Sequence, residues 1–160
     1  MNGQYLSAKS AEELYPLVQP ELAKLGVDGN KDAVLPAIAV VKTRSRTTLD
    51  VARQVAVRLD GKLVQLDEKA QKEIAKDPTG YHAALAASVI ALKNAPHWTP
   101  QGLEQVLRDL ADERNVAAGK IFQPIRIALT GGTVSEPVNE LLSVVGKEAA
   151  LRRLEAASLS

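Results

Sequence analysis

The sequence has 160 residues, of which 46% are hydrophobic and 24% are charged, and its formal net charge is +1. This balance is typical of a folded globular chain and argues against disorder. With so small a net charge, binding of nucleic acid would require local basic patches rather than a positive field over the whole surface. The absence of cysteine excludes disulfides, thiol catalysis and cysteine-ligated zinc.

The sequence contains neither a signal peptide nor a segment that could span a membrane. Residues 1–6 have no basic region and no apolar stretch of the kind found in signal peptides. The longest apolar runs, residues 33–41 and 83–92, are too short to span a bilayer. We therefore expect a cytoplasmic protein with no membrane partner. Aromatic residues make up only 3% of the chain, which argues against a stacking platform for single-stranded nucleic acid.

The first predicted helix begins at Ser10, which forms a capping box with Glu13, and ends at Lys24. Pro16 and Pro20 are expected to kink or split this helix, because proline lacks the N–H that a helix interior requires.

Two further helices are predicted before a domain boundary. One covers residues 31–43, and the next starts at a possible capping box of Thr47 and Asp50 and continues to Leu59. Asp60-Gly61 ends it and is the best candidate boundary. Residues 62–66 alternate between apolar and polar side chains, and we interpret them as an extended linker rather than a short strand.

The remainder of the chain also has helical periodicity. The predicted helices cover residues 67–76, 81–93, a segment from Pro100 that is capped by Thr99, residues 119–130, residues 136–145 opened by Ser135, and residues 147–157. The sequence thus predicts an all-α protein with two packed helical subdomains, residues 1–59 and 60–160.

No group of residues suggests catalysis or metal binding. His82 and His97 have no partners at ligand spacing, so surface or packing roles are favoured for both. The glycines at 131–132 lack the Lys-Ser/Thr ending of a phosphate-binding loop and follow a helix, so a helix C-cap explains them better.

The first basic segment contains Lys42, Arg44 and Arg46, with no acidic residue between Asp32 and Asp50. One interpretation is a solvated turn whose positive charges favour the preceding helix C-terminus. The other is contact with a phosphate or a base edge, since an arginine can bind either through two hydrogen bonds.

The second basic segment is the predicted helix 119–130, which carries Lys120 and Arg126 with no acidic residue between Glu113 and Glu136. A buried arginine needs a partner, because an unpaired buried charge is costly. Arg126 either extends from a packed helix toward solvent or a carboxylate such as Glu140, or contacts an anion. The residues alone leave both interpretations open.

The run Gln123-Pro124-Ile125-Arg126-Ile127-Ala128-Leu129-Thr130-Gly131 is followed by Gly146-Lys147-Glu148 and Leu151-Arg152-Arg153-Leu154. These segments closely resemble the C-terminal region of bacterial glutamyl-tRNA synthetase. Residues 2–6 and 42–49 are also similar to that family, so the resemblance covers essentially the whole chain. It is specific chiefly through the Gln-Pro-x-Arg-x-Ala-Leu-Thr-Gly pattern.

The resemblance implies an all-helical region that binds the anticodon loop of tRNA-Glu. Arg126 would contact the first anticodon base, with Thr130, Ser135 and Val138 as nearby walls. Arg44 would read the third base, where arginine accompanies rejection of tRNA-Gln, so the chain resembles the discriminating type. Lys42, Arg46 and Lys120 would attract phosphates. Residues 132–134 depart from the commoner loop sequence, and Arg46 is an additional basic residue beside Arg44.

The nucleotide-binding signatures of the same family, similar to His-Ile-Gly-His and Lys-Met-Ser-Lys-Ser, do not occur in this sequence. The resemblance therefore implies a monomeric fragment that is not catalytic alone and needs no cofactor. ATP would be used by the catalytic domain of the same enzyme, which becomes an expected partner. The alternative hypothesis is a helical protein–protein interaction scaffold without RNA readout.

Overall fold

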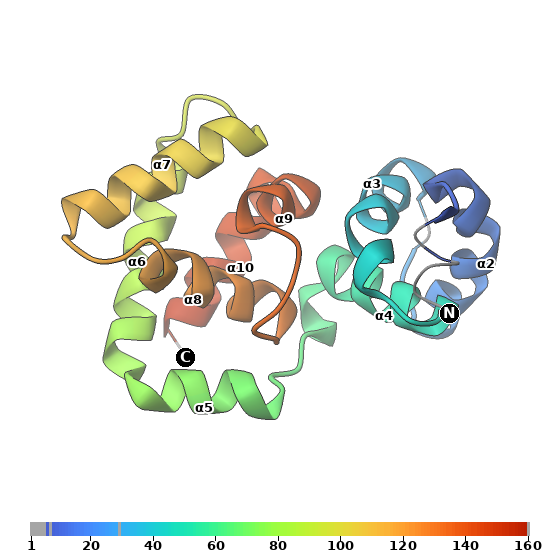
Figure 1. Ribbon diagram of the computed structural model, residues 1–160, viewed down its shortest axis with the longest axis horizontal. Helices are drawn as coiled ribbons and strands as arrows, with labels where there is room; N and C mark the ends of the chain where they lie inside the picture. The colour runs from blue at the N-terminus through green and yellow to red at the C-terminus, as the bar shows by residue number, and fades with distance from the viewer. Residues whose placement is uncertain (1–5, 7, 29, 160) are drawn as a thin grey trace. The chain divides into compact units, whose positions relative to one another are not determined.

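The computed structural model describes residues 6, 8–28 and 30–159, and it is helical with no strand over these residues (Figure 1). This confirms the all-α prediction. Two compact units make up the chain, Met1–Leu63 and Val64–Ser160. The division falls within the linker that the sequence predicts after Asp60. The similarity seen in residues 2–5 lies outside the described residues.

Among its described residues, the first unit contains helices α2 (Ala11–Lys24), α3 (Lys31–Val41) and α4 (Thr48–Leu59), each packed against the other two. Each helix buries one apolar face, as the helical spacing of apolar residues predicts. The short 3₁₀ turns Lys42–Arg44 and Gly61–Leu63 follow α3 and α4. The core of this unit includes Leu14, Val18, Leu22, Val34, Ile38, Val41, Val51 and Val55.

Helix α2 has the predicted capping box, because the Glu13 N–H donates to Ser10 Oγ and the Ser10 N–H donates to Glu13 Oε1, both at 3.1 Å. The expected split at the prolines is wrong, since α2 continues through Pro16 and Pro20. Both prolines lie on the exposed face of the helix. Water can therefore satisfy the carbonyls that lose an intrahelical partner there.

Helix α3 ends at Val41 rather than at the predicted residue 43. The Ser45 hydroxyl donates to the Val41 carbonyl at 2.8 Å, and the backbone tightens into the 3₁₀ turn. Helix α4 starts as predicted, with Thr47 Oγ1 accepting from the Asp50 N–H at 3.0 Å. The Asp50 carboxylate accepts in turn from the N–H of Arg46, one residue before the cap.

The second unit contains six helices among the described residues. They are α5 (Glu68–Lys76), α6 (Pro78–Lys93), α7 (Pro100–Glu113), α8 (Gly119–Thr130), α9 (Val138–Val145) and α10 (Lys147–Leu159). Helix α6 packs against α7, α8 and α10, and α9 packs against α7 (Figure 1). Their shared core includes Leu85, Leu92, Leu103, Leu107, Ile121, Ile125, Leu129, Leu141, Leu142 and Leu154.

Two helix starts in this unit differ from the prediction. Helix α6 begins at Pro78, three residues before predicted residue 81, because Asp77 Oδ1 accepts from the Gly80 N–H at 3.0 Å and caps it. Ser135 does not open α9. The helix starts after Pro137, and the Ser135 hydroxyl donates to the Glu136 carbonyl instead.

Candidate nucleic-acid interface

Arg126 lies on α8 with its guanidinium held from two sides. Its Nε donates to Ser135 Oγ at 2.9 Å, and its NH1 donates to Gln123 Oε1 at 2.5 Å. Both of these partners are uncharged and orient the guanidinium. The Ser135 hydroxyl is itself fixed, because it donates to the Glu136 carbonyl at 2.6 Å. The side chain is half-buried and points in a defined direction.

The end of α8 is tied to the loop that follows it. Thr130 Oγ1 donates to the Arg126 carbonyl at 2.7 Å and accepts from the Gly132 N–H at 3.1 Å. Gln123 Nε2 donates to the Thr133 carbonyl at 3.0 Å. Thr130 and Gln123 thus anchor the loop beside the guanidinium, and Gln123 holds both the loop and Arg126.

Gly131 ends α8 with a positive φ of 81° and a backbone conformation that suits glycine. The linker before α5 lies directly against it. Asp67 N–H donates to the Gly131 carbonyl at 2.8 Å, and a Cβ at this position would lie 2.1 Å from the Gln65 carbonyl oxygen. The predicted C-cap is therefore also a site of close backbone packing.

Val138, predicted as a wall of the site, is only 2% exposed and packs in the core of the second unit. Val134 in the loop between α8 and α9 is 77% exposed, and the sequence reasoning did not assign it a role. The sequence feature that could have indicated Val134 is its apolar side chain in a loop whose other residues are small or polar. This apolar group is on the surface beside Ser135, the residue that accepts from Arg126 Nε.

Lys120 lies in the first turn of α8 and is exposed. No acidic residue is close to Lys120 in the sequence, but the structure brings the carboxylate of Glu73 on α5 near it. The pKa of Glu73 is lowered, mainly by its hydrogen bond to Lys76 and also by the positive charge of Lys120. The field of Lys120 is therefore weakened by a carboxylate that is distant in the sequence.

In the first unit, the basic segment surrounds the 3₁₀ turn after α3. Lys42 is half-buried and its Nζ donates to the Lys9 carbonyl at 2.6 Å. One of the three N–H donors of its ammonium group is therefore used in a hydrogen bond within the protein. Arg44 is exposed, and its NH1 donates to the Val40 carbonyl at the long distance of 3.3 Å. This contact caps the helix end only weakly and leaves most of the guanidinium accessible.

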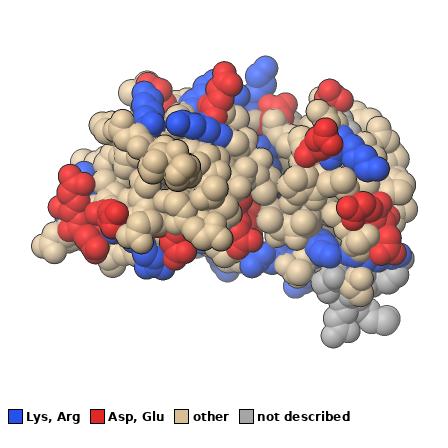
Figure 2. Space-filling view, turned by 90° about the horizontal axis from the view of Figure 1, so that it is seen from above, with Lys and Arg blue, Asp and Glu red and all other residues tan. Residues whose placement is uncertain are grey.

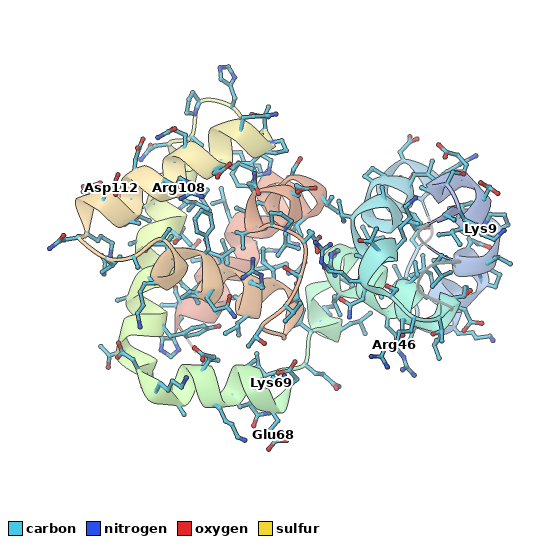
Figure 3. All side chains as sticks on the ribbon, in the orientation of Figure 1. Lys9, Arg46, Glu68, Lys69, Arg108 and Asp112 are labelled. Atoms are coloured by element: carbon cyan, nitrogen blue, oxygen red, sulfur yellow. The ribbon has the colours of Figure 1, made fainter. Side chains whose placement is uncertain are left out.

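Arg46 is exposed and its side chain points away from the first unit (Figure 3). By contrast, Arg58 on α4 is 2% exposed and its NH1 donates to both the carbonyl and the side-chain oxygen of Gln54. These bonds give Arg58 a structural role. Arg44 and Arg46 are the arginines of this segment that a ligand in solvent can reach.

Charges of both signs are interspersed over the face shown in Figure 2. Among the described residues, no cluster of His, Asp and Glu has the arrangement of a metal site. No helix in the described part of the chain is long and apolar enough to cross a membrane. Arg126, Thr130 and Ser135 are brought together in the second unit, while Lys42, Arg44 and Arg46 share one turn of the first.

Comparison with known proteins identifies related sequences and folds. A family model described as an anticodon binding domain matches residues 12–158. A glutamate–tRNA ligase from Syntrophobacter fumaroxidans is 35% identical over 96% of the chain, which covers 32% of that protein. Glutamate–tRNA ligase 2 from Rhodospirillum rubrum is 36% identical over 96% of the chain, which covers 33% of it.

The fold also occurs in a solved structure. The crystal structure of a glutamate tRNA ligase from Elizabethkingia meningosepticum matches 99% of the chain with a TM-score of 0.81 at 23% identity. The chain covers 31% of that protein. At this identity the similarity establishes the fold. The chain thus spans about a third of the length of the relatives that it matches.

Proposed function

Since the chain belongs to the anticodon-binding domain family, we propose that it is the tRNA-recognition region of a glutamate–tRNA ligase. Its ligand is the anticodon loop of tRNA-Glu, read by arginine contacts to the bases. Recognition of single-stranded loops commonly uses such contacts to the edges of splayed bases. Activation of glutamate with ATP belongs to a catalytic region that acts on the same tRNA.

The observation that carries the proposal is the fixed guanidinium of Arg126. Gln123 and Ser135 each take one of its N–H groups, and an arginine has five in a rigid fork. Preorganisation lowers the entropy lost on binding, so a guanidinium held in one orientation can discriminate between base edges. A good bidentate contact of this kind contributes about 1–3 kcal/mol of discrimination, by analogy with duplex readout. Arg126 is proposed to contact the first anticodon base.

Arg44 is proposed to read the third anticodon base and to reject tRNA-Gln. Its guanidinium carries donors only, whereas a glutamine amide carries both a donor and an acceptor. An arginine therefore favours a base edge that presents acceptors and disfavours one that presents a donor. The exposure of Arg44 and its single long bond to Val40 support this role, since little must be broken for it to bind.

The basic residues beside the two arginines are proposed to contact phosphates. Arg46 and Lys120 are exposed, and Lys42 keeps two donors beyond its bond to Lys9. Thr130 and Ser135 shape the loop around Arg126. Val138, which is 2% exposed, is proposed as a wall behind that loop.

The test compares transcripts of tRNA-Glu and tRNA-Gln for binding to the wild-type chain and to Arg44→Gln. We expect the wild type to prefer tRNA-Glu and the variant to lose most of that preference, a change of about ten-fold if one bidentate contact is involved. Filter binding or fluorescence anisotropy measures both. Equal preference in the two proteins would exclude the role given to Arg44.

A second arm of the experiment uses Arg126→Ala with transcripts that vary only the first anticodon base. A loss confined to the cognate base supports base reading by Arg126. A uniform loss over all bases would indicate a phosphate contact or a folding role instead. Binding of neither tRNA by the wild type would favour the protein–protein scaffold.

A further inference from the structure

The second unit contains a pocket of about 300 Å³ that is separate from the contacts of Arg126 with Ser135. It lies where the end of α5, the first turns of α6 and the first half of α8 meet the loop after α7. No residue predicted from the sequence to bind RNA lines it except Lys120. Gln123 also lines it, and is the one residue that it shares with the Arg126 contacts.

The interior of the pocket is apolar. Ala84, Ile121 and Ile127 contribute side chains that are almost fully buried. Tyr81 and Pro124 are half-buried and add a ring face and a flat apolar surface. Burial raises the pKa of the Tyr81 hydroxyl, which therefore stays neutral and can donate a hydrogen bond. This interior suits a planar organic group.

The charged residues around the pocket are three cations, Lys76, Arg114 and Lys120, and two carboxylates, Glu73 and Asp77. Glu73 is paired with Lys76 at 2.9 Å, and Asp77 is engaged as the cap of α6. The side chains of Arg114 and Lys120 make no hydrogen bond or ion pair with another described residue, although the charge of Glu73 lies near Lys120. Both are exposed.

An anion at this pocket would be bound by side chains. The first amides of α8 are already used, since Lys120 N–H donates to the Ala117 carbonyl and Ile121 N–H donates to the Ala118 carbonyl. Arg114 and Lys120 therefore supply the positive charge. Together with the apolar interior, they match a ligand that combines a planar ring with a phosphate.

We propose that this pocket binds a single nucleotide, with its base against Tyr81 and Pro124 and its phosphate between Arg114 and Lys120. The nucleotide is either free or part of an RNA strand, because both present the same chemistry. Base stacking on such surfaces contributes about 1–3 kcal/mol, and charge-assisted hydrogen bonds add to it. The inference does not depend on anticodon reading by Arg126.

Titration of the ¹⁵N-labelled chain with CMP, followed by amide chemical shifts, tests the proposal. We expect saturable shifts at the pocket residues and weaker effects from cytidine or inorganic phosphate, each of which offers only half of the ligand. If inorganic phosphate binds as well as CMP, the base contributes nothing and the assignment to a nucleotide is wrong.

A matched pair of variants locates the site. A Cβ at Gly119 would meet no atom within 4 Å, and the residue lines the pocket, so Gly119→Glu and Gly119→Gln are both accommodated. They differ only in charge, and an acidic residue favours a helix start. We expect CMP to bind Gly119→Glu about three- to ten-fold more weakly than Gly119→Gln, through repulsion of the phosphate. Equal affinities would overturn the proposal.

Repeating the titration with a short oligocytidine distinguishes the two sources of nucleotide. Tighter binding of the oligomer, with the same sensitivity to Gly119→Glu, assigns the pocket to an RNA strand, whereas CMP binding alone assigns it to a free nucleotide. If neither CMP nor the oligomer shifts the amide signals of the pocket residues, the proposal is wrong. The outcome is independent of discrimination between tRNA-Glu and tRNA-Gln, so either proposal can fail while the other stands.

Discussion

The guanidinium of Arg126 is positioned by one residue of its own helix and one residue of the following loop. Gln123 lies one turn earlier on α8, so its contact follows from helical spacing. Ser135 reaches Nε only because the loop folds back along the helix. The sequence could therefore predict that an arginine on the largely apolar helix α8 needs a partner, but not which loop residue provides it.

Two buried serines differ in whether the hydroxyl has a hydrogen-bond partner, and their substitution by alanine should change stability in opposite directions. Ser88 on α6 is fully buried, and its hydroxyl has no hydrogen-bond partner among the described residues. Ser45 is buried too, but donates to the Val41 carbonyl. Leaving a buried polar group unpaired costs about 1–3 kcal/mol. We expect Ser88→Ala to raise the free energy of unfolding by up to about 1 kcal/mol.

The matched variant Ser45→Ala should lower the free energy of unfolding by about 1 kcal/mol, because it removes a bond at the end of α3. Urea unfolding followed by circular dichroism measures both variants. A loss of stability in Ser88→Ala similar to that in Ser45→Ala would mean that the Ser88 hydroxyl is satisfied in solution.

At the scale of elements, local signals predicted most helix starts. The side chains of Ser10, Thr47 and Thr99 cap α2, α4 and α7 as expected. Errors arose where burial or a neighbouring turn decides the outcome. The exposed position of Pro16 keeps α2 continuous, and Asp77 caps α6 while also ending α5. Such effects depend on surroundings that a linear pattern does not contain.

Gly131 joins the end of α8 to the linker before α5, and its substitution tests that contact. Gly131→Ala combines an unfavourable left-handed backbone with a clash against the Gln65 carbonyl. We expect it to lower the free energy of unfolding by more than about 2 kcal/mol. Thermal or urea unfolding by circular dichroism provides the measurement.

Gly26 supplies the control for Gly131. Its φ is 78°, but a Cβ there would meet no atom within 4 Å. Gly26→Ala should therefore show the backbone effect alone, about 1 kcal/mol. If the two variants lose the same stability, the close contact with Gln65 makes no contribution.

The capping box of α2 predicts a dependence on pH. The pKa of Glu13 is lowered, chiefly by the Ser10 backbone N–H, then by the Ser10 side chain. A carboxylate with a lowered pKa stabilises the folded state above its unfolded pKa and loses that contribution as pH falls through the folded value. We expect Glu13→Gln to be less stable than the wild type at neutral pH, with the difference shrinking as pH falls through the lowered pKa of Glu13 in the folded state.

The contrast between wild type and Glu13→Gln is measured by urea unfolding across this pH range. Glu12→Gln is the control, because it neutralises the neighbouring first-turn acid of α2 and leaves the capping box intact. A difference between wild type and Glu13→Gln that does not change with pH would show that the charge of Glu13 is not what stabilises the helix start.

For the whole molecule, charge decides how binding of tRNA responds to salt. The net charge of +1 gives little long-range attraction, so the response reports the phosphates contacted locally. If Lys42, Arg46 and Lys120 each neutralise one phosphate of a single-stranded loop, the logarithm of the association constant should fall against the logarithm of salt with a slope of about −2. Anisotropy titrations between about 50 and 300 mM salt cover the range in which phosphate contacts are lost.

Removing one of these cations should reduce the slope by a fixed amount. The expected change is about 0.7 for Arg46→Ala, and the preference for tRNA-Glu over tRNA-Gln should persist because a phosphate contact carries no sequence information. Arg44→Gln should do the reverse, with a large loss of preference. A variant at Arg46 that abolished the preference while leaving the slope intact would move base reading from Arg44 to Arg46, the additional arginine of the same turn.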